Sequence, residues 1–150
     1  MKKIFLLLTV LAFLGCDNDS TGTSGGSYTI ADLVGTWEML TEETITTIAN
    51  QTPTTENRVA DNNNSKFLTV YENGTFYIVD LTNGVPDEDT GSFTVNGNSV
   101  TVDVVGVPIE ITGTLSITAN ILTMFTSYNL GTDDCDSCVL VQITTIMQKV

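Results

Sequence analysis

The sequence predicts an all-β domain in which eight antiparallel strands follow one another up and down. Thr, Val, Ile and Asn are abundant, whereas Ala, Lys and Glu rarely recur at helical spacing, which favours strands over helices. Short turns that contain Asn or Gly separate the β-rich runs. Eight sequential strands are enough to close a barrel and remove its exposed edges. A two-sheet sandwich built from the same strands is the alternative.

The N-terminus has the features of a secretory signal peptide over residues 1–15. Two lysines precede an apolar run at residues 4–14, which is too short to span a bilayer, since a spanning helix takes about 20 apolar residues. The end of the run, Phe13-Leu14-Gly15-Cys16, resembles the lipobox of bacterial lipoproteins. This resemblance implies that Cys16 is acylated, for example with palmitate, and becomes the first residue of the mature protein. An ordinary secreted protein cleaved nearby is the alternative.

The segment after the cleavage point, residues 16–29, is rich in Gly, Ser and Thr and predicts a flexible tether. Removal of residues 1–15 takes away two of the five basic residues and none of the eighteen acidic ones, so the formal net charge changes from −13 to −15. A chain this acidic repels phosphate backbones, so no nucleic-acid partner is expected. We expect membrane contact through the N-terminal lipid, at the outer membrane or cell surface rather than the inner membrane.

The domain, residues 30–150, is expected to begin with a helical turn at residues 30–34 and to continue almost entirely as strands. Asn73-Gly74 lies between β-rich runs and is the strongest kind of hairpin signal. Turns at residues 96–98 and 118–120 predict two further hairpins. The longest stretch without a strand pattern, residues 50–65, is expected as a loop at the barrel mouth. The predicted strands are residues 37–48, 66–71, 75–81, 91–95, 99–104, 108–117, 121–128 and a last one from 138 or 139 to 149.

Three segments resemble, in order and spacing, the lipocalin-like domains of bacterial lipoproteins. They are Gly35-Thr36-Trp37, Glu72-Asn73-Gly74-Thr75-Phe76 and the hairpin at residues 91–102. The resemblance covers about residues 30–150 and implies an up-and-down barrel of eight strands. It also implies that Trp37 plugs the closed end and that a basic residue of the last strand, here Lys149, covers its ring. A solvated terminal lysine is the alternative.

A barrel of this family implies a lipid-anchored binding module, not an enzyme, with a small apolar ligand in its interior. A filled core is the alternative, because interiors pack densely, and such a protein would bind a protein or glycan through its loops. Strand parity with Trp37 places Glu43 inside, near the mouth, where it can hydrogen-bond a ligand. The residues expected to line the interior are Met39, Leu68, Val70, Phe76, Ile78, Phe93, Val102, Met124 and Val141.

The chain contains no histidine, the commonest general base and metal ligand, and we expect neither a catalytic site nor a cofactor. Two acidic segments, residues 87–89 and 133–136, lack the spacing of a calcium loop and are expected as solvated turns, so no metal site is expected. Cys135 and Cys138 have redox-motif spacing. Neighbouring carboxylates oppose a thiolate, so we expect a structural disulfide. A protein partner is not identified.

Overall fold

The computed structural model describes residues 27–130 and 138–150. The expected signal peptide, Cys16, residues 17–26 of the tether, Cys135 and the acidic segment 133–136 lie outside the described residues. In the part that is described, no helix has the length and apolar character needed to cross a bilayer.

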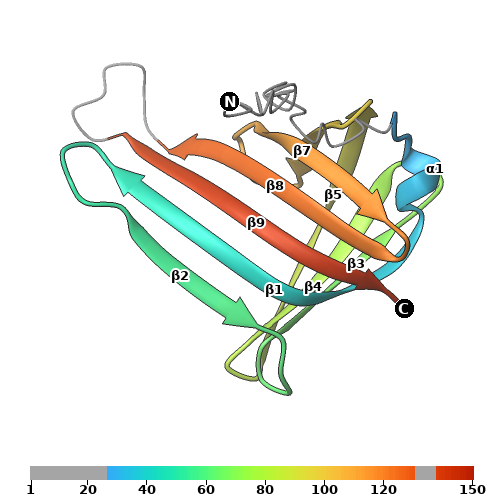
Figure 1. Cartoon of the computed structure of the whole chain (residues 1–150), viewed down its shortest axis with the longest axis horizontal. Coiled ribbons are helices and arrows are strands. Elements are labelled where there is room, and N and C mark those ends of the chain that lie inside the picture. The colour runs from blue at the N-terminus through green and yellow to red at the C-terminus, as the bar shows by residue number, and fades with distance from the viewer. Residues whose placement is uncertain (1–26, 131–137) are drawn as a thin grey trace, which may run out of the picture.

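The described chain forms one antiparallel sheet that closes on itself (Figure 1). The strands from β3 to β9 are neighbours in sequence order, and β1 pairs with both β3 and β9, which closes a barrel of 8 strands. The all-β barrel expected from the sequence is therefore confirmed. A further strand, β2, pairs with the second half of β1. The elements are α1 (Ile30–Leu33), β1 (Gly35–Ile48), β2 (Thr54–Val59), β3 (Ser65–Val70), β4 (Thr75–Thr82), β5 (Val85–Asn96), β6 (Ser99–Val104), β7 (Ile111–Thr118), β8 (Ile121–Leu130) and β9 (Val139–Lys149).

The three hairpins predicted from Asn- and Gly-containing turns lie at one end of the barrel, where they join β3 to β4, β5 to β6 and β7 to β8. Gly74 and Gly97 supply the positive φ angles, 82° and 65°, that these turns require and that glycine adopts without steric cost. Tyr28, which the sequence placed in the tether, is held at the same end. Its backbone forms a bridge to Gly97, and its hydroxyl donates to the carbonyl of Ile117.

This end of the barrel is closed by packed apolar side chains. Leu33 of α1, Trp37 of β1 and Phe76 of β4 are each at most 2% exposed. Burial of one such side chain stabilises the fold by roughly 1.5–3 kcal/mol. The ring centroids of Phe76 and Phe93 are 4.6 Å apart, and Gly91 leaves room for this pair because a Cβ there would lie 2.5 Å from the Phe76 ring. The end of the barrel next to α1 is therefore filled with side chains.

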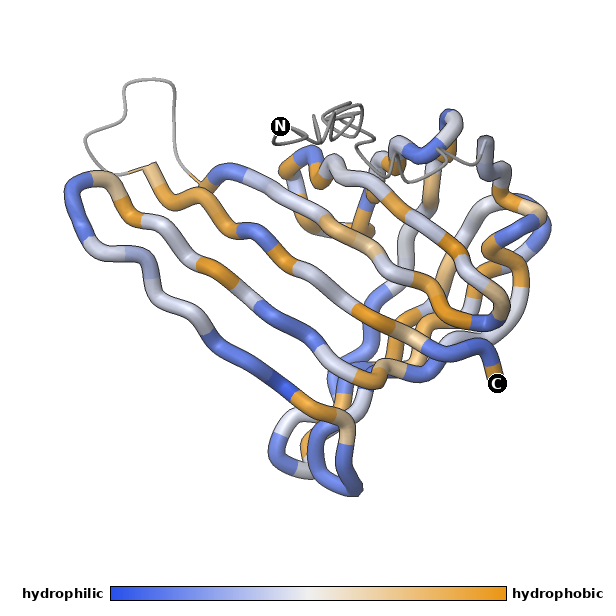
Figure 2. Tube along the Cα trace, in the orientation of Figure 1, coloured by the Kyte–Doolittle hydropathy of each residue, from blue (hydrophilic) through white to orange (hydrophobic). Residues whose placement is uncertain are grey.

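The stretch expected as a mouth loop, residues 50–65, is in part the strand β2, so the loop prediction is wrong over residues 54–59. Figure 2 shows that β2 is hydrophilic along nearly its whole length, unlike β8 and β9, where apolar and polar residues alternate. Both faces of β2 are largely exposed, and its backbone hydrogen bonds to β1 define it. A strand of this kind carries no apolar alternation for a sequence pattern to detect.

The acidic segment 87–89, expected as a solvated turn, lies inside strand β5, where it pairs with residues 78–80 of β4. The turn comes earlier, at Asn83 and Gly84, with φ angles of 52° and 78°. Asn-Gly is a hairpin signal here as well. The strand predicted at residues 91–95 is the second half of β5, and its first half was not predicted because residues 85–90 contain a proline and three carboxylates, which are depleted in strands.

Candidate functional site

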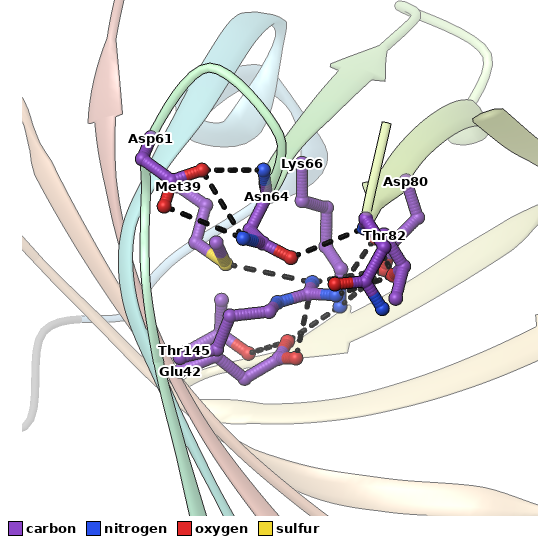
Figure 3. Close-up of polar contacts among 10 residues, drawn as sticks. Met39, Glu42, Asp61, Asn64, Lys66, Asp80, Thr82 and Thr145 are labelled. Carbon is purple, nitrogen blue, oxygen red and sulfur yellow. Dashed lines mark hydrogen bonds and ion pairs between the residues drawn. The ribbon is translucent and has the colours of Figure 1, made fainter. Parts of the chain in front are cut away.

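Four charged side chains from four strands meet inside the open end of the barrel, opposite α1. Glu42 comes from β1, Arg58 from β2, Lys66 from β3 and Asp80 from β4. Figure 3 shows the side chains of Lys66 and Asp80 directed toward Glu42, with Thr145 of β9 beside the glutamate. We call the four charged residues the mouth network.

Each cation of the mouth network contacts both carboxylates. Arg58 binds Asp80 through two hydrogen bonds, Nη1 to Oδ1 at 2.9 Å and Nη2 to Oδ2 at 3.0 Å, and its Nη2 lies 3.3 Å from Glu42 Oε1. Lys66 Nζ lies 2.5 Å from Glu42 Oε2 and 3.2 Å from Asp80 Oδ2. The Thr145 hydroxyl donates to Glu42 Oε2 at 3.2 Å. The network is formally neutral, and its side chains are only 11–23% exposed.

The network shifts the pKa of two of its members toward the charged form. Partial burial alone would raise the pKa of Asp80, but hydrogen bonds from Arg58 and Lys66 and the charges of both cations outweigh it and lower that pKa. Partial burial would likewise lower the pKa of Arg58, yet the Asp80 hydrogen bond and the Glu42 and Asp80 charges raise it. Both groups therefore stay ionised at neutral pH.

A bulge in β1 decides which glutamate enters the barrel. The pairing with β9 shifts register between Met39 and Thr41, which leaves Leu40 as an extra residue. The extra residue reverses the alternation of faces, so Glu42 points inward and Glu43 is exposed. The prediction that Glu43 points inward is therefore wrong. Leu40 offers no glycine or other local signal from which the bulge could have been anticipated.

An apolar chamber of about 130 Å³ lies beside the mouth network, inside the barrel. Glu42, Lys66, Thr126 and Thr145 supply its polar wall, and the rest of the wall is apolar. Of the residues expected to line the interior, five belong to this wall: Leu68, Ile78, Phe93, Val102 and Met124.

The other four residues expected to line the interior do not reach the chamber. Met39, Val70 and Phe76 are at most 1% exposed and belong to the packed core. Val141 is 7% exposed and lies outside both the core cluster and the chamber wall. The polar wall was not predicted from the sequence. Glu42 faces the interior only because of the bulge, and no pattern in the sequence distinguishes Lys66.

A second hollow of about 460 Å³, which we call the vestibule, lies along the inner side of the β4–β5 hairpin. Asp80, Asp87 and Asp89 contribute to its lining. Lys66 and Ile78 line both the vestibule and the chamber, so the two hollows adjoin at these two side chains.

At the closed end, Lys149 Nζ lies 5.2 Å from the centroid of the Trp37 ring. The lysine stem crosses Gly35, where a Cβ would lie 2.8 Å from Lys149 Cε and where φ is 128°. The indole Nε1 donates to the carbonyl of Leu33 at 2.7 Å and so ties Trp37 to α1. The Gly-x-Trp segment thus combines a glycine that leaves space for a lysine with a tryptophan that the lysine covers.

Two further expectations from the sequence concern the pairing of Cys135 with Cys138 and the absence of a metal site. Cys138 is described and Cys135 is not, so their pairing stays a prediction. The described residues contain no group of three or more Asp, Glu or Cys placed to hold a metal ion.

No family model matches the chain, and no curated protein matches its sequence. Two solved structures resemble the fold, both mutant forms of the vaccine antigen Transferrin Binding Protein B from Haemophilus parasuis Hp5. The single mutant has a TM-score of 0.44 at 12% identity, and the double mutant 0.47 at 13%. Each alignment covers 77% of this chain but only 27% and 25% of the antigen chain, so this chain spans about a quarter of that protein's length.

Proposed function

We propose that the protein is a lipid-anchored binding module whose barrel takes a small molecule into the chamber beside the mouth network. The observation that carries the proposal is the contrast between the two halves of the barrel. The closed end is packed, whereas the upper interior keeps a hollow of about 130 Å³ with a mostly apolar wall. A barrel of 8 strands that served only as a scaffold would fill this space with side chains.

The chamber fits the apolar part of a ligand about as large as a single ring. An engineered apolar cavity of about 150 Å³ in another protein binds benzene. Phe93, Val102 and Met124 would contact the ring from one side. Glu42 and Lys66 would offer a hydrogen-bond acceptor and donor from the other side.

The proposal includes no catalysis. A general acid or base works best with a pKa near the operating pH. The pKa of Asp80 is lowered, away from neutrality, and its carboxylate is held by Arg58 and Lys66. The chain has no histidine to supply a base in its place. These features support a binding role.

The proposal places the barrel at the bacterial cell envelope, attached through acylated Cys16 and the tether that follows. The outer membrane or cell surface is the proposed location. Mass spectrometry of the mature protein from its own host tests the anchor. We expect fatty-acyl mass on a chain that begins at Cys16, and an unmodified N-terminus would contradict the proposal.

Native mass spectrometry of the same preparation tests the ligand. We expect a bound small molecule in the wild type and its loss in Val102→Phe and Met124→Phe, which fill the chamber, with melting curves as the check that each variant folds. A ligand that both folded variants retain would lie elsewhere and contradict the proposal. An empty barrel with a bound protein would favour recognition through the loops instead.

A further inference from the structure

The charges around the vestibule do not balance. Within the mouth network, Arg58 and Lys66 compensate Glu42 and Asp80. The vestibule has further carboxylates on β5 that form no ion pair within the described residues. These are Asp87 and Asp89.

Both free carboxylates face the inside of the barrel mouth. In an antiparallel pair, directly opposed residues project to the same face. Asp87 lies opposite Asp80, and Asp89 lies opposite Ile78, the residue shared by the vestibule and the chamber. Because the mouth network is formally neutral, they leave two uncompensated negative charges in the vestibule beside the chamber.

A ligand whose apolar part fills the chamber can extend into the neighbouring vestibule. The two hollows adjoin at Lys66 and Ile78, so the outer end of such a ligand would pass these residues and meet Asp87 and Asp89. Lys66 does not cancel these carboxylates, because its ammonium already bridges Glu42 and Asp80. The formal charge of the whole chain, −13, repels anions as well.

We propose that the ligand of the chamber is a small organic cation, an amine attached to one compact apolar group. This inference rests on the proposed function, because it assigns a charge class to the ligand of that chamber. The apolar group lies against Phe93, Val102 and Met124, and the ammonium lies in the vestibule between Asp87 and Asp89.

The charge preference should be moderate and dependent on salt. Asp87 and Asp89 are exposed, so water screens their attraction. One unit pair about 4 Å apart in water corresponds to roughly fivefold in affinity, and two carboxylates at less ideal distances to about tenfold. The Debye length falls from about 30 Å at 0.01 M salt to about 3 Å at 1 M, so the preference should largely disappear at high salt.

The test compares three probes of similar shape, benzylamine, benzyl alcohol and benzoate, by isothermal titration calorimetry with the whole mature protein. At about 0.01 M salt we expect benzylamine to bind about tenfold more tightly than benzyl alcohol, and benzoate to bind most weakly. At about 1 M salt we expect the amine and the alcohol to converge.

A charge-matched pair of variants locates the effect. Asp87→Asn combined with Asp89→Asn should remove the amine preference and leave the affinity for benzyl alcohol unchanged. Glu88→Gln combined with Asp103→Asn removes the same charge from exposed positions on the opposite face of β5 and β6 and should keep the preference. Melting curves show whether each variant folds.

The outcomes separate this inference from the proposed function. Equal binding of benzylamine and benzyl alcohol to the wild type, lost in Val102→Phe, would overturn the charge preference and leave the chamber as a binding site. A preference that persists in Asp87→Asn/Asp89→Asn would also overturn it. If no probe binds the wild type, the proposed function fails together with the inference.

Discussion

Among individual residues, the few cations of the domain hold defined positions. After residue 15 the chain has three basic residues, Arg58, Lys66 and Lys149, against eighteen acidic ones. Arg58 and Lys66 compensate carboxylates in the mouth network, and Lys149 covers the ring of Trp37. The cations thus lie at the two ends of the barrel, against carboxylates at the mouth and against an indole at the closed end.

Replacement of Lys149 by Met tests the closed end. We expect the free energy of unfolding to fall by about 0.5–2 kcal/mol and the Trp37 fluorescence to change, because the indole loses a cation over its ring. Lys149→Arg keeps the cation and serves as the control. Unchanged melting and fluorescence in Lys149→Met would mean that the lysine is merely solvated.

The lowered pKa of Asp80 predicts a loss of stability in acid. Because the folded-state pKa lies below the ordinary pKa of an aspartate, Asp80 contributes stability that is present above the ordinary pKa and lost as pH falls through the folded-state pKa. Asp80→Asn should cost about 1–3 kcal/mol at neutral pH, since Arg58 and Lys66 each lose a carboxylate. The variant should also lose less stability than the wild type between about pH 5 and about pH 2. Denaturant unfolding at several pH values measures both effects, and equal acid sensitivity in the two proteins would contradict the account.

Among the elements, β2 joins the barrel wall by two kinds of contact. Its backbone pairs with β1, and its Arg58 reaches Asp80 on β4. The loop that follows β2 also meets the β4–β5 turn, where Gly84 N donates to the carbonyl of Asn63 at 2.8 Å. This strand therefore belongs to the rim of the mouth, where Arg58 adds half-buried ion pairs to its backbone pairing with β1.

Replacement of Arg58 by Met should loosen β2 selectively. We expect roughly tenfold faster amide hydrogen exchange in residues 54–59, because β2 keeps its backbone pairing and loses its tie to Asp80. Glu56→Gln, on an exposed residue of the same strand, is the matched control. Exchange that rises equally in β2 and in β7 would indicate general destabilisation and contradict a local role for Arg58.

The sequence predicted those elements whose signals are local. Asn73-Gly74 lies at a turn, and the alternation along β9 places Val141, Thr145 and Met147 on the buried face. The structure differs from the prediction where pairing with another strand determines the conformation. β2 is a strand because β1 pairs with it, and Glu42 points inward because of an extra residue, Leu40.

In the molecule as a whole, one closed sheet holds a packed base and a hollow upper half. The β1–β9 ladder closes the barrel along its full height, from the Trp37–Lys149 pair to the Ile48–Val139 pair. The apolar part of the candidate site follows from strand parity, as for Phe93 and Val102. The mouth network does not follow from strand parity. The order of the strands in the sheet brings its residues together, and two of them, Glu42 and Asp80, are 38 positions apart in the sequence.

An amide chemical-shift titration of the isotope-labelled mature protein with benzyl alcohol shows directly whether the upper barrel binds a ligand. We expect saturable shifts that gather around the chamber, for example at Leu68, Phe93 and Met124, and that disappear in Val102→Phe. The base near Leu33 and Val100 should stay unshifted, since it is already filled. No saturable shift, or shifts confined to exposed residues, would contradict the claim that the upper barrel is a binding chamber.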